Sequence, residues 1–271
     1  MKKIIFSIPL FINLLVAFEE SPWVDFPYEF HFKSAWKESY YSKIANSYNQ
    51  TSKYKNSVNE QLNLALSVST ISLLDVQLES EFFQTKATNF TLESLGVQVR
   101  KQLFDDIQGD LVSLTLGGLF RFVPDQALKD PYVPYQNLVN FEANFSLGKE
   151  FDEAFEWTKR FYTFFSCGIA NIGSPYIRSK TVFEIHKGHH LFGWILDGNF
   201  GLEGKRSVNL ENFHGYGSVR HQTLDIGVTY DYLFDIYGKV SAAFFYRLYA
   251  FAAPKNQAAI EFKYDLPFSI F

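Results

Sequence analysis

The stretch LDIGVTYDYLF, residues 224–234, decides the fold class because apolar and polar residues alternate along it. In an extended chain, successive side chains point to opposite faces. This stretch is therefore predicted to form a strand with one apolar, aromatic face and one face that bears carboxylates. The apolar face consists of Leu224, Ile226, Val228, Tyr230, Tyr232 and Phe234, and the other carries Asp225, Gly227, Thr229 and Asp231.

The same period of two recurs along the whole chain, which predicts an all-β fold of about twelve strands. The alternation is least regular in the first segment and in residues 177–203, and a count of ten strands is the alternative. Besides 224–234, the alternating segments are 28–36, 61–69, 74–82, 95–103, 112–122, 139–147, 161–169, 183–186, 192–200, 240–248 and 260–266.

Composition narrows the class of protein further. Aromatic residues make up 18% of the 271 residues, which favours strands. The formal net charge of -4 leaves no electrostatic footprint for nucleic acid, so we predict no such partner. Lys2 and Lys3 precede a short apolar run that ends at Phe18, as in an export signal. We therefore predict a signal peptide over residues 1–18 and one barrel domain over residues 19–271.

The connections between the predicted strands alternate in length. Three are long and polar, at residues 41–59, 123–137 and 202–221. Those between them are mostly tight, at residues 70–73, 104–109, 187–190 and 234–237. Short turns at one end and long loops at the other are typical of a transmembrane barrel.

Alternation alone does not say which face is buried. In a soluble secreted barrel the apolar face would point inward. The predicted strands are long enough for a tilted membrane crossing, and their polar face is rich in Ser, Thr, Asn, Gln and Gly rather than in Lys and Glu. We therefore predict a closed antiparallel transmembrane β-barrel in up-and-down order, with lipid outside and water inside.

An exported chain with many amphipathic strands, alternating loop lengths and a terminal Phe271 resembles the outer-membrane β-barrel proteins of double-membraned bacteria. The resemblance covers the mature chain and implies a location in the bacterial outer membrane, in contact with its lipids. In that superfamily, a terminal aromatic on the last strand is recognised by the barrel-assembly machinery. Here Phe271 is out of phase with the row from Ile260 to Ile270, and Pro267 interrupts the strand.

The inward face then carries the candidate functional residues. Charged groups in a bore need water or one another, and a row of them can select solutes by sign and size. We predict a narrow, porin-like channel for small hydrophilic solutes, with no cofactor. The predicted lumen residues are Glu79, Arg100, Arg121, Glu142, Glu184, Asp225, Asp231, Arg247, Glu261 and Lys263.

Two other classes of function remain open. In the segment HGYGSVRH, His214, Ser218 and His221 offer a nucleophile and a base, as a lipid-modifying hydrolase would require. An adhesin or structural barrel would instead bind a partner through its long loops, especially 202–221. The segment HKGHH, residues 186–190, has three histidines whose spacing could suit a metal. Its simpler explanation is a tight turn between two strands, and we predict no metal site.

Overall fold

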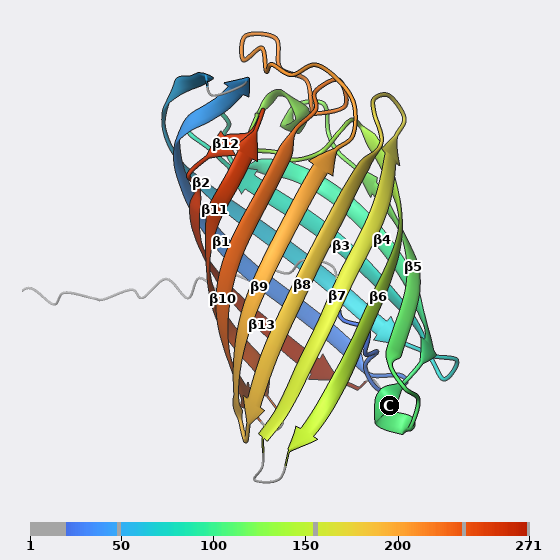
Figure 1. The fold of residues 1–271 in the computed structure, drawn as a ribbon. Helices are drawn as coiled ribbons and strands as arrows, with labels where there is room; N and C mark the ends of the chain where they lie inside the picture. The colour runs from blue at the N-terminus through green and yellow to red at the C-terminus, as the bar shows by residue number, and fades with distance from the viewer. Residues whose placement is uncertain (1–19, 48–49, 154–156, 235–236, 270–271) are drawn as a thin grey trace, which may run out of the picture.

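The computed structural model describes residues 20–47, 50–153, 157–234 and 237–269, which form one closed barrel (Figure 1). Each long strand pairs antiparallel with the long strands before and after it in the sequence, and the last strand pairs with the first to close the sheet. Closure runs from Phe30, opposite Phe268, to Tyr40, opposite Ala258. The predicted twelve-stranded meander is confirmed, and the ten-stranded alternative is wrong.

Twelve long strands form the wall. They are β1 Phe30–Ser47, β2 Gln50–Ser69, β3 Leu74–Gln84, β4 Thr91–Phe104, β5 Ser113–Phe122, β6 Val139–Glu153, β7 Trp157–Ala170, β8 Tyr176–Lys187, β9 His190–Gly201, β10 Gln222–Phe234, β11 Gly238–Phe251 and β13 Ala258–Phe268. A two-residue strand, β12 Pro254–Lys255, pairs with the end of β1. Two 3-10 helices, η1 Asp106–Gln108 and η2 Ala127–Lys129, lie in connections. None of the helices in the described residues is long and apolar enough to cross a membrane.

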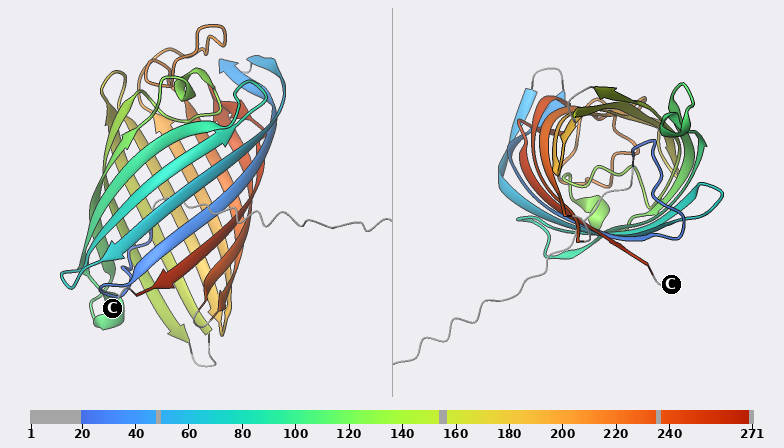
Figure 2. Two further views of the ribbon diagram at one scale, coloured as in Figure 1. Left: turned by 180° about the vertical axis from the view of Figure 1, so that it is seen from behind. Right: turned by 90° about the horizontal axis from the view of Figure 1, so that it is seen from below.

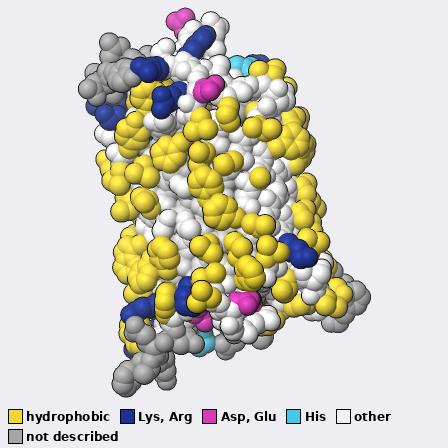
Figure 3. Space-filling view, turned by 45° about the vertical axis from the view of Figure 1, so that its right-hand side comes forward, with side chains coloured by type: hydrophobic (Ala, Val, Ile, Leu, Met, Phe, Trp, Pro, Cys, Tyr) yellow, Lys and Arg dark blue, Asp and Glu magenta, His cyan; other side chains and the backbone are white. Residues whose placement is uncertain are grey.

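The outer surface is apolar, as the sequence predicts. In the stretch quoted above, Ile226, Val228 and Tyr230 are exposed, whereas Asp231 is buried inside the barrel. Hydrophobic side chains cover the middle of the outer surface, and most charged ones lie near its two ends (Figure 3). The apolar rows therefore do not meet in a dry core.

One predicted loop is wrong. Residues 41–59 do not form a long loop, because β1 and β2 continue as a paired hairpin to Ser47 and Gln50. The segment contains neither Gly nor Pro, so nothing in it prevents extended pairing. Its polar composition reflects strands that extend past the apolar band, where neither face has to be apolar. The loops at 123–138 and 202–221 are long, and with this hairpin they define the long-loop end of the barrel.

The N-terminal segment, residues 20–29, precedes β1 at the opposite, short-turn end. Part of it runs inside the ring of strands, as the blue tube in the right-hand view of Figure 2 shows. It is held at its C-terminal side by Tyr28, whose amide donates to the carbonyl oxygen of Ser69 at 2.7 Å. The bore is therefore occupied by chain from one end, in addition to the loops at the other.

Candidate solute pathway

The barrel encloses an open cavity of about 250 Å³. Its lining comes from the inner faces of the strands, from loops 123–138 and 202–221, and from Glu20 of the N-terminal segment. Six cationic and eight acidic side chains line it, so its formal charge is negative. Seven of the ten predicted lumen residues are among them, namely Glu79, Arg121, Glu142, Asp225, Arg247, Glu261 and Lys263.

Arg121 on β5 organises one side of the cavity. Its Nη1 donates to Glu81 Oε2 at 2.6 Å, and its Nη2 donates to Glu79 Oε2 at 3.1 Å. Glu93 lies nearby and accepts a hydrogen bond from Gln61 Nε2 at 2.9 Å. Two carboxyl groups thus contact one guanidinium and a third lies near it, so the formal charge of this side of the cavity is negative. The prediction missed Glu81, although it shares the phase of Glu79 and could have been found from that.

On the other side, cations and carboxylates are more evenly matched. Glu142 accepts hydrogen bonds from Tyr176 Oη at 3.0 Å and from Arg178 Nη1 at 3.3 Å. Arg247 and Asp225 form a bidentate pair with distances of 2.7 and 2.8 Å, and Lys263 lies 2.6 Å from Glu261. Such pairing offsets part of the cost of removing these charges from water inside the barrel.

The remaining three predicted residues point inward but lie nearer the short-turn end, outside the cavity. Arg100 is buried and pairs with Asp75 at 2.7 Å. Glu184 lies 3.2 Å from His186 Nε2. Asp231 accepts a hydrogen bond from Thr229 Oγ1 at 2.8 Å.

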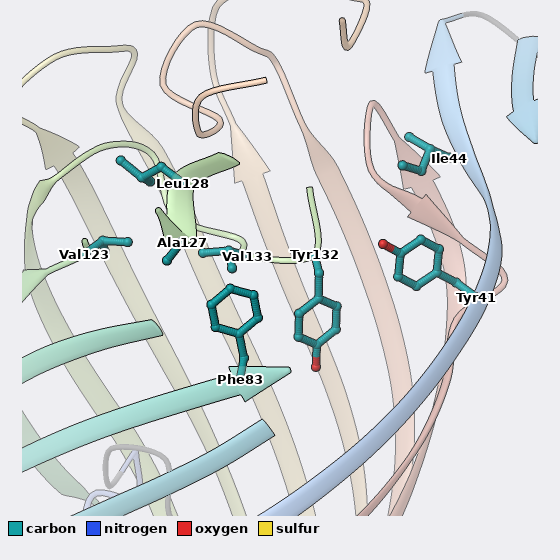
Figure 4. Close-up of a cluster of buried hydrophobic side chains, with 8 residues drawn as sticks. All are labelled: Tyr41, Ile44, Phe83, Val123, Ala127, Leu128, Tyr132 and Val133. Carbon is teal, nitrogen blue, oxygen red and sulfur yellow. The ribbon is translucent and has the colours of Figure 1, made fainter. Parts of the chain in front are cut away.

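Loop 123–138 folds inward over the long-loop end. Its buried residues Val123, Leu128, Tyr132 and Val133 pack with Phe83 of β3 and with two residues of β1 in one apolar cluster (Figure 4). Beyond this cluster, the Tyr135 hydroxyl reaches the charged group: it accepts a hydrogen bond from Arg121 Nη1 at 2.7 Å and also bonds Glu81. An apolar cluster therefore anchors the loop while one phenol reaches the charges below.

Loop 202–221 packs against loop 123–138. The amide of Gly215 donates to Leu128 O at 2.7 Å, and that of Gly217 to Gln136 O at 2.9 Å. The Tyr216 hydroxyl donates to Pro131 O at 2.7 Å. The two loops thus form one cover that narrows the mouth.

The geometry does not assemble the candidate hydrolase site. His214 Nε2 lies 2.6 Å from Asp125 on the exposed outer side of the loops. His221 is buried, with its ring centroid 4.5 Å from that of Tyr216, and burial lowers its pKa to about 4. Within the described ranges, no hydrogen bond joins the Ser218 hydroxyl to either histidine, so a nucleophile and its base are not in contact.

The three histidines at the turn between β8 and β9 have other partners. His186 lies beside Glu184, the His189 ring packs against Tyr232, and the His190 ring packs against both Tyr230 and Tyr232. In the part of the chain that the structure describes, no group of three or more His, Cys, Asp or Glu residues could hold a metal ion.

Asp106 of η1 lies at the short-turn end and anchors the N-terminal segment. Its carboxylate accepts hydrogen bonds from Trp23 Nε1 at 3.0 Å, from the amide of Glu150 at 2.6 Å and from the Ser113 hydroxyl. Partial burial favours the neutral acid, but these hydrogen bonds outweigh it and lower the pKa of Asp106. Asp106 therefore stays ionised to a lower pH than an ordinary aspartate does.

Comparison with known proteins gives the fold. No protein-family model matches the chain, and no curated protein sequence matches it. An outer membrane channel from Pseudomonas putida F1 superposes with a TM-score of 0.62 over 93% of this chain and 100% of its own, at 12% identity. The NanC porin superposes with a TM-score of 0.52 over 86% of this chain and 97% of its own, at 9% identity. At these identities the likeness is one of barrel architecture.

Proposed function

We propose that the protein is a channel of a bacterial outer membrane that passes small hydrophilic solutes through a charged lumen. One observation carries the proposal: a closed barrel with an apolar exterior encloses a cavity of about 250 Å³ lined by ionisable side chains. The two superposed structures with this architecture are a channel and a porin, which supports it.

Electrostatic filtering is the mechanism that fits such a lining. The loop cover and the N-terminal segment narrow the bore, so a solute passes within reach of fixed charges rather than through bulk water. Of the ten predicted lumen residues, the seven that line the cavity would select solutes by sign and size.

The proposal includes how the protein reaches and meets the membrane. Residues 1–18 would be an export signal, and they lie outside the described residues. Outer-membrane lipids would contact the apolar band, and the barrel-assembly machinery would recognise the last strand. Phe271 also lies outside the described residues, but Ile260 and Phe262 supply an exposed apolar row on β13.

Two measurements test the proposal. Heat-modifiable migration in gels should reveal a detergent-resistant barrel before boiling. Purified, refolded protein in a planar bilayer should then give discrete conductance steps. A folded barrel that stays electrically silent at all voltages would refute the channel.

A further inference from the structure

Residues 20–24, here called the strap, cross the inner face of the barrel at the short-turn end. Three of its carbonyl oxygens accept hydrogen bonds from the wall. Ser146 Oγ donates to Glu20 O at 2.7 Å, Arg100 Nη1 to Ser21 O at 2.7 Å, and Thr115 Oγ1 to Pro22 O at 2.6 Å. Because these donors belong to β6, β4 and β5, the strap is fixed across three adjacent strands.

The wall is shaped to receive the strap. A Cβ placed on Gly148 would lie 2.7 Å from Pro22 Cγ, so a larger residue there would collide with the strap. The Trp23 ring packs edge-on against Tyr162 at 5.8 Å, and the Arg160 guanidinium lies 4.9 Å from its centre. These contacts involve residues far apart in the sequence, and they make the strap a fixed part of the lumen.

At its far end, the strap carries a carboxylate into the solute pathway. One oxygen of Glu20 accepts from Arg178 Nη2 at 2.9 Å, and the other accepts from Lys180 Nζ at 2.7 Å. The Glu20 side chain is only 8% exposed, and all three side chains line the cavity. Glu20 thus places a tethered negative charge against two of the six cations of the pathway.

We propose that Glu20 is a specificity-determining residue that makes the lumen prefer cations. In a narrow bore, the sum of the fixed charges sets the sign of the ion that enters. Without the Glu20 charge, the segment of wall around Arg178 and Lys180 becomes more positive and admits anions, including carboxylate-bearing solutes. This inference rests on the proposed channel function.

The test is the reversal potential of the purified mature protein in a planar bilayer with a KCl gradient. Glu20→Gln keeps the side-chain shape but removes the charge. We expect it to lower the K⁺/Cl⁻ permeability ratio by about three- to tenfold, as one charge acting over roughly 10 Å through a partly aqueous medium would do. Glu20→Asp should keep the wild-type ratio, and so should Glu203→Gln in the exposed outer loop.

A wild-type channel whose ratio is unchanged by Glu20→Gln refutes the inference and leaves the channel function standing. A silent wild type with a conducting Glu20→Gln refutes both the open channel and the proposed cation preference, and so does silence of both proteins. An intact mass that lacks Glu20 also refutes the inference. If Glu20→Gln does not fold, Lys180→Gln must shift the ratio in the opposite direction, and a ratio that stays the same decides against the proposal.

Discussion

Val228 offers a direct test of which face of the barrel meets lipid. It is the middle residue of β10, it is 48% exposed, and it lies between Trp194 and Phe244 on the neighbouring strands. Val228→Arg would put a cation at the centre of the apolar band. Such a change costs about 2–4 kcal/mol at the bilayer midplane of a barrel. The folding equilibrium should therefore fall by about 30- to 900-fold.

The assay is urea-dependent unfolding from phospholipid vesicles. Leu202→Arg is the matched control, because Leu202 is 44% exposed but follows the end of β9 at the long-loop end. Its cost should be about 0–1 kcal/mol, since the penalty falls toward the membrane interface. Equal losses for the two variants would show that the band meets water, and the assignment of the lipid face would be wrong.

Three further predictions follow from contacts inside the barrel. Asp106→Asn should destabilise the protein at pH 6. Because the folded-state pKa of Asp106 is lowered, its stabilisation is complete above the unfolded-state pKa of about 3.9 and is lost as the pH falls through the folded-state pKa, so the loss caused by the substitution should shrink below about pH 4; a loss independent of pH would contradict this. Gly168→Ala should lower the free energy of unfolding in urea by about 1–3 kcal/mol, because the new Cβ would lie 2.2 Å from the Tyr176 ring. Gly118→Ala is the control and should lower it far less, since its Cβ would lie 3.7 Å from the nearest atom. Equal losses would refute the steric reason. Tyr135→Phe removes a hydrogen bond to a charged group, worth about 1.5–3 kcal/mol, that helps to hold loop 123–138 over the bore. Single-channel records should therefore show openings at least about ten times more often. An unchanged frequency would mean that this phenol does not hold the loop.

The strand number and the orientation of the faces could be predicted because both are local properties. A strand such as β10 carries its own period of two, and lipid outside with polar groups inside leaves Val228 and Asp225 on opposite faces. The same phase places Glu79 and Arg121 inside without any knowledge of their partners. Their pairing is also local in the sheet, since they lie on strands separated only by β4.

What the sequence did not reveal depends on contacts between distant segments. Glu20 meets Arg178 and Lys180 on β8, more than 150 residues away, and no periodicity records that contact. Tyr135 lies in a loop whose polar composition predicts exposure, yet an apolar cluster carries it inward. The hairpin of β1 and β2 was missed for another reason: polar strands beyond the apolar band look like a loop in composition.

The local strand pattern governs the stability of the barrel, whereas the contacts between distant segments govern conduction. The apolar rows of the strands determine whether the barrel can reside in lipid, and changes such as Val228→Arg should act on folding while leaving the bore unaltered. The strap and the two long loops occupy the bore, where polar contacts hold the strap and apolar clusters with a few hydrogen bonds hold the loops. Changes such as Glu20→Gln and Tyr135→Phe should therefore alter conductance or ion selectivity in a barrel that still shows heat-modifiable migration. If selectivity instead followed substitutions on the lipid-facing rows, the pathway would not run through the lumen.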